Sequence, residues 1–249
     1  ALVVDAFPGD DLEALERQID ARTRLLLLCS PHNPVARVWS RQELEDLATL
    51  CRRRGLILVS DEIHHDLVMP GYRHVPTAAL CAETAAITVT LTSATKTFNL
   101  AGLGGSLAII PDPTLRQRFC AVRDGLWTEV ANAFAVTAVE AAWRHGEPWL
   151  EQVLSYVQAN YEHLAAFLAR RLPAARVLPL QGTYLAWVDL RALGYGDGEL
   201  KRRILRRAGV WLDDGPMFGT GGEGFQRINL ACPRVTLQEA LERMAAALA

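Results

Sequence analysis

The 249-residue sequence has no long apolar run and no opening segment of the kind that targets a chain to a membrane. Its longest apolar stretches, "LLLLC" at 25–29 and "LILV" at 56–59, fall far short of the roughly 20 apolar residues that a bilayer-spanning helix needs. No charged-then-apolar leader precedes the first predicted helix. We therefore expect no membrane partner.

The sequence also lacks an excess of charge of one sign, because its formal net charge is only -2 and basic and acidic residues are interspersed. A broad basic field of the kind that binds nucleic acid is therefore not expected.

Cysteine is scarce, and the five residues form no C-x-x-C pair. Free thiols in mostly apolar segments favour a reducing, cytoplasmic compartment.

Half of the residues are hydrophobic, which suffices for a sizeable core. In the first part of the chain, predicted strands and helices alternate, as is typical of parallel β-α-β units. We expect helices at 11–21 and 41–54 and strands at 25–29, 56–60, 86–92 and 105–110. Ser40 and Glu43 have the spacing of a capping box, and Gly55 follows as a helix stop. This half is expected to form one mainly parallel sheet, in which the strand at 25–29 is fully buried and the strand at 56–60 is buried.

The second part has a different pattern, with long helices and short strands. Helices are predicted at 114–123, 129–144, 148–172, 198–208 and 236–248, and strands at 175–178, 183–188 and 225–230. The fold class is therefore α/β, with a mainly parallel large domain at 1–146 and a smaller α/β domain at 147–249. The long helix at 148–172 is expected to join them.

Polar side chains follow three successive predicted strands. Asn33 follows the first, Asp61 the second, and Lys96 the third, where Ser93 and Thr95 accompany it. Ligands of open parallel sheets bind beyond the carboxyl ends of the strands. We therefore expect these groups to share one crevice.

Each of these residues also has an ordinary interpretation. Asn33 precedes a proline and is typical of a turn, Asp61 is able to cap a turn, and a single lysine such as Lys96 is most often a solvated surface residue. A buried carboxylate, however, requires a cationic partner. An acid, a lysine and hydroxyls at neighbouring strand ends are together what pyridoxal phosphate requires, because lysine forms the Schiff base and the acid pairs with the protonated ring nitrogen.

Four motifs strengthen this interpretation: "SPHNPVARVWS", "SDEIHHDL", "SATKTFNLAGL" and "RINLACPR". In this order and spacing they resemble fold-type I pyridoxal-phosphate enzymes of the class I/II aminotransferase superfamily. Within it, the chain is most similar to the cystathionine β-lyase, or C-S lyase, branch. The resemblance implies a fold-type I large domain, part of which is expected to be missing at the N-terminal side, and a small domain.

The resemblance also implies roles for individual residues. Lys96 resembles the catalytic lysine that forms the Schiff base, and Asp61 the partner of the pyridinium nitrogen. Asn33 resembles the side chain that hydrogen-bonds the 3'-oxygen of the ring. Ser93 and Thr95 match hydroxyls that bind the phosphate.

Two residues of the second domain match positions near the substrate. Arg227 resembles the arginine that binds the α-carboxylate, for which a bidentate guanidinium is well suited. Without the surrounding motif, we would interpret Arg227 as an ordinary strand residue whose charged end reaches solvent. Tyr184 in "QGTYLAW" is expected near the substrate, although a core tyrosine is an equal alternative.

His64 lies three residues after the aspartate, where many aminotransferases have tyrosine, and it favours the lyase branch. We expect it to contact the cofactor. His64, His65 and Asp66 also raise the alternative of a metal site, but no further ligand lies at a suitable spacing. The glycine-rich "GLGG" and "GTGGEG" lack the spacing of nucleotide-binding loops.

The chain departs from the family pattern at two turns. Ala36 stands where the family usually has glycine after "NPV", so the family's turn residue with positive φ is not expected at this position, and no reacting group is affected. Gly104 stands where many aminotransferases have a phosphate-binding arginine. The phosphate charge would then have to be met by other groups.

The resemblance further implies that the chain begins partway through the large domain, and its first residue is Ala rather than Met. Strands, a phosphate-binding turn and the aromatic residue stacked on the cofactor are expected in the absent part, together with much of a homodimer interface.

The expected reaction is β-elimination of cystathionine or cysteine S-conjugates in amino-acid metabolism, which gives a thiol, pyruvate and ammonia. Transamination by the same residues is the alternative enzyme function. A truncated, non-catalytic regulatory relative is the alternative of another class.

Overall fold

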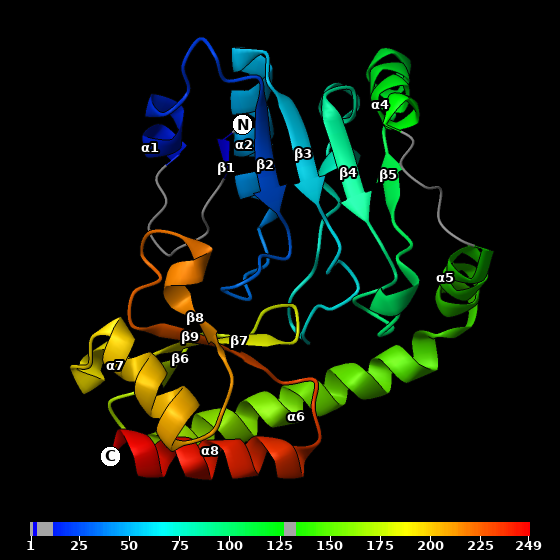
Figure 1. Cartoon of the computed structure of the whole chain (residues 1–249). Coiled ribbons are helices and arrows are strands. Elements are labelled where there is room, and N and C mark those ends of the chain that lie inside the picture. Colours follow the sequence, from blue (N-terminus) through cyan, green and yellow to red (C-terminus); the bar gives the residue numbers. More distant parts are fainter. Residues whose placement is uncertain (1, 4–11, 127–132) are drawn as a thin grey trace. The chain divides into compact units, whose positions relative to one another are not determined.

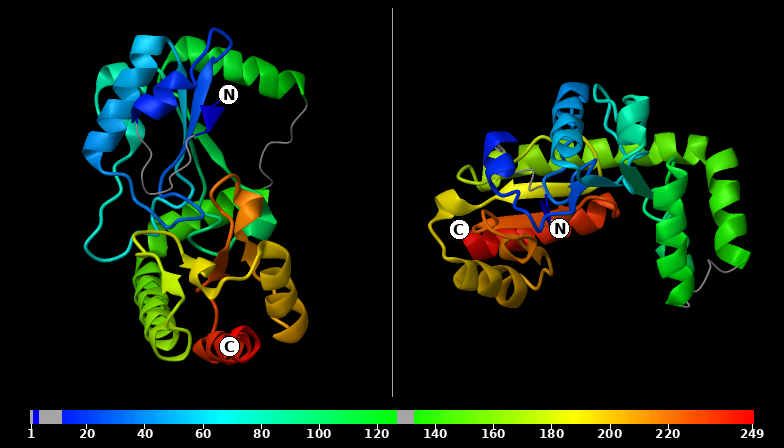
Figure 2. Two further views of the ribbon diagram at one scale, coloured as in Figure 1. Left: turned by 90° about the vertical axis from the view of Figure 1, so that its left-hand side faces the viewer. Right: turned by 90° about the horizontal axis from the view of Figure 1, so that it is seen from above.

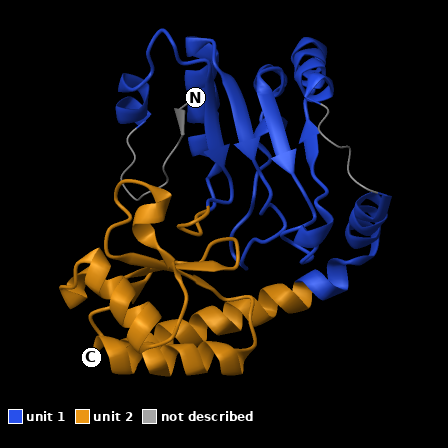
Figure 3. Cartoon of the chain, viewed as in Figure 1, with its two compact units in different colours: residues 1–32, 38–150 blue, residues 33–37, 151–249 orange. Residues whose placement is uncertain are grey.

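The computed structural model describes residues 2–3, 12–126 and 133–249 and divides into two compact units (Figure 3). Unit 1 comprises residues 1–32 and 38–150, and unit 2 comprises residues 33–37 and 151–249. The short segment 33–37 thus packs with the C-terminal residues. The functional domains at 1–146 and 147–249 stay a prediction, because the two units are defined by packing alone.

Unit 1 contains a five-stranded sheet in the order β1-β2-β3-β4-β5 (Figure 1). Its strands are β1 (Leu2–Val3), β2 (Leu25–Cys29), β3 (Ile57–Asp61), β4 (Thr88–Thr92) and β5 (Leu107–Ile109). The first four are parallel, which confirms the predicted β-α-β pattern. The prediction of a mainly parallel sheet is confirmed, and the exception is β5, which pairs antiparallel with β4. The connection between them holds only the 3-10 turn η2 (Ala101–Leu103), whereas a parallel return usually needs a crossover helix.

Two strands of unit 1, β2 and β3, bury alternate residues. In β2, Leu26 and Leu28 are buried, whereas Leu25, Leu27 and Cys29 between them are only partly covered. The prediction of fully buried strands was therefore wrong for β2, where alternate residues point to opposite faces of the sheet. Helix α2 (Arg41–Arg54) lies along one face (Figures 1 and 2).

Helix α2 has the ends that the sequence predicts. The Glu43 amide donates to Ser40 Oγ at 3.3 Å, and the Ser40 amide donates to the Glu43 carboxylate at 2.8 Å. Gly55 ends the helix with φ 64°, a left-handed conformation that costs glycine little. At the other end of the helix, an N-cap such as Ser40 stabilises a helix by about 1 kcal/mol. The helix buries Leu44, Leu47, Ala48, Leu50 and Cys51.

The remaining helices of unit 1 are α1 (Leu12–Arg17), η1 (Thr77–Ala79), α3 (Ala82–Ala85), α4 (Pro113–Gly125) and α5 (Ala133–His145). The first residue of the predicted helix at 11–21 and the first four of that at 129–144 lie outside the described residues. In α4, Asp112 accepts from the Leu115 amide at 2.7 Å, and Pro113 occupies the first turn. Among the described side chains of α4, none is buried. Phe119, Val122 and Leu126 near its C-terminal end are exposed.

Unit 2 contains an antiparallel sheet in the order β6-β7-β9-β8. Its strands are β6 (Arg176–Val177), β7 (Leu185–Asp189), β8 (Asp213–Asp214) and β9 (Phe225–Asn229). Trp187 is fully buried and stacks on Phe225 with ring centroids 5.2 Å apart. The short β8 carries none of the alternation that identifies a strand, and it was not predicted from the sequence.

The helices of unit 2 are α6 (Glu147–Arg171, which begins in unit 1), α7 (Asp197–Lys201), the π-helix η4 (Arg202–Arg207) and α8 (Arg234–Leu248), with 3-10 turns η3 (Arg191–Leu193) and η5 (Gly215–Phe218). The helix predicted at 198–208 is thus an α-helical turn followed by a π-helix.

The buried Asn160 of α6 donates to the carbonyls of Leu230 and Cys232 at 2.8 and 3.0 Å and accepts from Arg234. It therefore fixes where α8 begins.

Candidate active site

Lys96 extends from a buried turn at the end of β4. Ala94, Thr95 and Thr97 around it are 0%, 8% and 2% exposed, whereas Lys96 itself is exposed. Inside the turn, the Phe98 amide donates to Ala94 and the Leu100 amide donates to Thr95, both at 2.9 Å. The turn is thus held from within and presents one amine outward.

The predicted phosphate-binding hydroxyls shape this turn. Ser93 Oγ accepts from the Thr95 amide at 3.0 Å, and it lies 2.8 Å from Thr95 Oγ1 and within hydrogen-bond distance of the Gly105 carbonyl. Both side chains are buried. In this structure, therefore, the two hydroxyls are engaged with the chain itself.

Asp61 ends β3 beside β4, since it pairs with Leu91 in the parallel ladder. One of its carboxylate oxygens accepts from the Ile63 amide at 3.1 Å. Desolvation by neighbouring parts of the chain raises the pKa of Asp61, with a contribution from Glu62, while the Ile63 amide and the charge of Lys96 oppose that rise. The prediction of a buried acid at this position was wrong, because the residue is exposed at the end of its strand.

The buried acid at this strand end is Glu62, which sequence reasoning missed. It is 3% exposed and accepts from Ser60 Oγ at 2.9 Å and the Thr77 amide at 3.0 Å, and it lies 2.9 Å from His74 Nε2. Burial opposes ionisation, but the bonds from His74, Thr77 and Ser60 together lower the pKa of Glu62. The adjacent acid in "SDEI" was the only signal for it, since nothing in the spacing singles out His74.

The histidines after β3 have different environments. His64, a predicted cofactor contact, is 3% exposed, whereas His65 is partly buried beside Asp66. No cluster of three or more metal-binding side chains occurs in the described part of the chain. The role of His64 stays a prediction.

In unit 2, Arg227 on β9 contacts Asn33, another predicted site residue that is distant from it in sequence. Its guanidinium donates to Asn33 Oδ1 at 2.5 Å and to Asp213 Oδ2 at 2.6 and 3.1 Å, and it lies 4.6 Å from the centroid of the Phe218 ring. These bonds use three of its five N–H groups. Asp213 and Phe218 were not predicted from the sequence, because β8 and η5 carry no recognisable motif.

Tyr184 belongs to the same neighbourhood. Burial raises the pKa of Tyr184, and the positive charge of Arg227 opposes this rise. The hydroxyl is therefore neutral near physiological pH and is able to donate a hydrogen bond. Within unit 2, the structure thus associates Asn33, Tyr184 and Arg227.

The turn that carries Asn33 is anchored by Ala36. Its carbonyl accepts from the amides of Gln181 and Gly182, both at 3.0 Å, and its φ is 60°. Alanine therefore adopts at this turn the positive φ that glycine adopts at little cost. Gly104 also has positive φ, at 68°.

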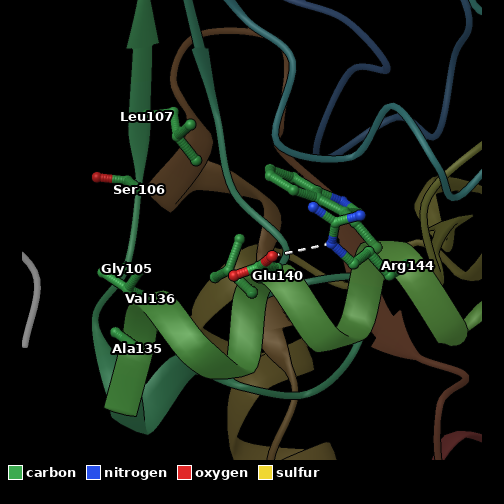
Figure 4. A pocket seen from close by; sticks show the side chains of 9 residues that line it. Gly105, Ser106, Leu107, Ala135, Val136, Glu140 and Arg144 are labelled. Atoms are coloured by element: carbon green, nitrogen blue, oxygen red, sulfur yellow. Dashed lines mark hydrogen bonds and ion pairs between the residues drawn. The ribbon is translucent and has the colours of Figure 1, made fainter. Parts of the chain in front are cut away.

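A cavity of about 450 Å³ lies in unit 1 between β5 and α5 (Figure 4). Its walls are mainly apolar, and Glu140 and Arg144 form an ion pair at 2.9 Å on one side. Its lining comprises Gly105, Ser106, Leu107, Ala135, Val136, Val139, Glu140, Trp143 and Arg144. The predicted site residues do not contribute to it.

None of the helices in the described ranges has the length and apolar character that crossing a membrane requires.

The chain is similar in sequence to three known proteins, and in structure to two of them. The chain is 45% identical over 241 residues to cystathionine beta-lyase PatB of Bacillus subtilis (strain 168), covering 96% of this chain and 62% of PatB. It is 37% identical to cystalysin from Treponema denticola, whose crystal structure contains pyridoxal 5'-phosphate, with a TM-score of 0.94 over 99% of this chain and 63% of cystalysin. It is 28% identical to N-succinyldiaminopimelate aminotransferase from Mycobacterium tuberculosis, with a TM-score of 0.84 over 95% of this chain and 62% of that enzyme.

The chain therefore spans less than two thirds of the length of these relatives. The structural likeness confirms the predicted α/β fold class. The sequence model of the family described as aminotransferase class I and II matches residues 5–244. Together with the order of Asn33, Asp61, Lys96 and Arg227 along the chain, this match shows that the chain belongs to the aminotransferase class I and II family.

Proposed function

We propose that the chain forms the cofactor-binding lysine site of a pyridoxal-phosphate enzyme, with Lys96 as the residue that bonds the cofactor. The observation that carries this proposal is the exposed Lys96 amine, which extends from a buried turn within electrostatic reach of Asp61. The relatives named above support it, because the cystalysin structure contains this cofactor.

The residues present fit pyridoxal phosphate in their donor chemistry. An exposed amine is available for a covalent bond, and the neighbouring Asp61 carboxylate reaches solvent. The fit is weaker for Ser93 and Thr95, because their hydroxyls already bond to each other and to the chain. When bound, the cofactor supplies an electron sink that weakens the bonds at the α-carbon of an amino acid.

Each of the chain's own groups then has a defined task. With the cofactor bound, the Asp61 carboxylate would accept a hydrogen bond from the N–H of the ring and favour the charged form of that nitrogen. Lys96 Nζ would accept the α-proton of the substrate as a general base. Arg227 binds the substrate carboxylate through its two remaining N–H groups, and Asn33 holds the guanidinium in place.

For the reaction, we propose β-elimination from cystathionine or another cysteine S-conjugate, which releases a thiol, pyruvate and ammonia. The 45% identity to PatB supports a carbon-sulfur lyase. Transamination is the second candidate, which the similarity to the Mycobacterium tuberculosis aminotransferase favours. A non-catalytic regulatory chain is a third candidate, which the shorter span relative to these enzymes favours.

The composition of the chain makes the first test unusually direct, because Lys96 and Lys201 are its only lysines. The protein is mixed with pyridoxal phosphate, reduced with borohydride, digested and analysed by mass spectrometry. We expect the added mass on the peptide that contains Lys96 and loss of the cofactor absorbance in Lys96→Ala.

The matched control is Lys201→Arg, which keeps the ion pair that Lys201 makes with Asp214 at 2.7 Å. This variant should label as the wild type does. Labelling of Lys201 alone, or of neither lysine, would contradict the proposed role of Lys96.

The second test separates the candidate reactions. Cystathionine is added to the cofactor-loaded protein, and pyruvate is measured with and without a keto acid. Pyruvate without a keto acid supports elimination, whereas product only with a keto acid supports transamination. Cofactor bonding without either product favours the non-catalytic chain.

We also propose a cytoplasmic homodimer. The five cysteines are free in this structure, which suits a reducing compartment. Sedimentation analysis of the cofactor-loaded protein tests the dimer, and a single species at the mass of one chain contradicts it.

A further inference from the structure

A polar network that the proposed reaction does not use connects the loops after β3 and β4. Its members are Glu62, His65 and Asp66 on the first loop and Thr92 and Thr97 at the second. All of them belong to unit 1. Thr97 directly follows Lys96, and Glu62 directly follows Asp61.

The bonds run in one chain from one loop to the other. Thr97 Oγ1 donates to Asp66 Oδ2 at 3.1 Å, and Asp66 Oδ1 lies 3.2 Å from His65 Nε2. His65 Nδ1 lies 2.8 Å from the Glu62 carbonyl and 3.0 Å from Thr92 Oγ1. The imidazole therefore bridges the backbone beside Asp61 and the residues on either side of the lysine turn.

Both ring nitrogens of His65 face acceptors. The Glu62 carbonyl has no hydrogen to give, so Nδ1 has to donate to it, and Nε2 has to donate if it bonds the Asp66 carboxylate. Only the doubly protonated imidazole satisfies both. Accordingly, the Asp66 carboxylate raises the pKa of His65, and burial opposes this rise only in part.

The network is buried at its threonines and partly buried at His65 and Asp66. Thr97 is 2% exposed and Thr92 is 8% exposed, and the side chains of His65 and Asp66 are 28% and 23% exposed. Trp143 of α5 also hydrogen-bonds Asp66, which contributes to the lowered pKa of that carboxyl. Hydrogen bonds to a charged group in such surroundings are stronger than bonds on an open surface.

We propose that His65 and Asp66 are positioning residues that hold the turn of Lys96 against the end of β3 and so fix the amine relative to Asp61. They act through Thr97, Thr92 and the Glu62 carbonyl, and they take no part in bond making. The catalytic importance of this positioning rests on the proposed function, in which Lys96 bonds the cofactor. The geometry of the turn itself is testable without cofactor.

The first test measures the turn directly by amide hydrogen exchange of the cofactor-free protein. In Asp66→Asn, the Phe98 and Leu100 amides, which close the turn, should exchange about tenfold faster, as expected for loss of one hydrogen bond to a charged group. The amides of β2 and α2 should keep their wild-type rates. The control is Asp124→Asn, because the Asp124 carboxylate bonds only its exposed neighbour Arg123 among the interactions described.

A second pair of variants keeps the test valid if Asp66→Asn fails to fold. Thr97→Val removes the hydroxyl that donates to Asp66 and keeps the shape of the side chain, whereas Thr97→Ser keeps the hydroxyl. We expect faster exchange of the Phe98 amide in Thr97→Val and rescue in Thr97→Ser. Equal rates in both variants would overturn the proposal.

The environment of the amine supplies an independent readout. Reductive methylation with a 13C label gives separate NMR signals for Lys96 and Lys201, the only two lysines, with a third from the terminal amine. The chemical shift of the Lys96 signal should change in Asp66→Asn, and that of the Lys201 signal should not. If both signals are unchanged, or if both change together, the positioning role is wrong. Failure of the cofactor to bond Lys96 in the wild type would contradict the proposed function but leave these cofactor-free results intact.

Discussion

Arg227 donates a hydrogen bond to Asn33 at 2.5 Å, although 194 positions separate the two residues. This bond joins the C-terminal sheet to the turn at 33–37, which packs in the same unit. Asn33 was predicted to bind a cofactor and Arg227 a substrate. Their contact means that one residue orients the other, so a change at either is expected to affect both tasks.

Replacing Arg227 tests the proposed carboxylate site. We expect Arg227→Lys to weaken binding of cystathionine to the cofactor-loaded protein by about tenfold, because lysine cannot form a planar bidentate pair. Titration with substrate measures the dissociation constant. Arg206→Lys, at an exposed position of η4, is the control and should bind normally. Equal affinity in the two variants would remove Arg227 from the proposed site.

The strained turn at Ala36 offers a stability test. An L-residue with φ near 60° costs roughly 1–2 kcal/mol, and glycine avoids that cost at an entropic penalty of about 0.5–1 kcal/mol. Ala36→Gly should therefore raise the free energy of unfolding by up to about 1 kcal/mol. Urea unfolding at neutral pH measures this change, and Ala48→Gly in the interior of α2 should lower stability instead. A loss of stability in Ala36→Gly would show that the turn is not strained.

The buried Glu62 should contribute to the pH dependence of stability. Its folded pKa lies below the unfolded value, so its stabilising contribution is fully present above the unfolded pKa and is lost as pH falls through the folded pKa. Glu62→Gln should lower the free energy of unfolding by about 1–3 kcal/mol at pH 7, because buried hydrogen bonds lose their charged acceptor.

Urea unfolding of Glu62→Gln and the wild type at a series of pH values checks this prediction. The difference between them should shrink below about pH 4, under the ordinary pKa of a glutamate. Glu45→Gln on α2, where the carboxylate pairs weakly with Arg41 on the surface, is the control. A difference that does not depend on pH would mean that Glu62 acts only through its shape.

The cysteines should differ sharply in reactivity. Burial raises the pKa of the Cys51 thiol to about 12, so almost no reactive thiolate forms at pH 8, whereas Cys81 is exposed. Iodoacetamide at pH 8 should therefore modify Cys81 in the native protein and leave Cys51 intact until urea is added. Peptide mass spectrometry measures both, and rapid native modification of Cys51 would contradict its buried position.

Much of the fold was predictable because local signals agreed with the tertiary structure. Ser40, Glu43 and Gly55 set the ends of α2 through bonds that depend only on neighbouring residues. The direction of β5 was not predictable, because an apolar run has the same pattern in parallel and antiparallel pairing. The two residues of β8 were also missed, since their pairing depends on β9 and on no pattern of their own.

The candidate site was predictable in part for a similar reason. Lys96 and Asp61 follow predicted strands, so their position at one sheet edge follows from parallel order. Glu62, His74 and the bond between Asp66 and Thr97 depend on loop conformations that bring distant residues together. No periodicity in the sequence encodes those contacts.

The edge strand β5 has a consequence for handling the protein. All three of its residues are exposed, and Leu107 and Ile109 are 40% and 51% exposed. In the described sheet it pairs on one side only, with β4. An apolar strand with an open edge is a template for β-pairing between molecules, so aggregation of the 249-residue chain at high concentration should begin at β5.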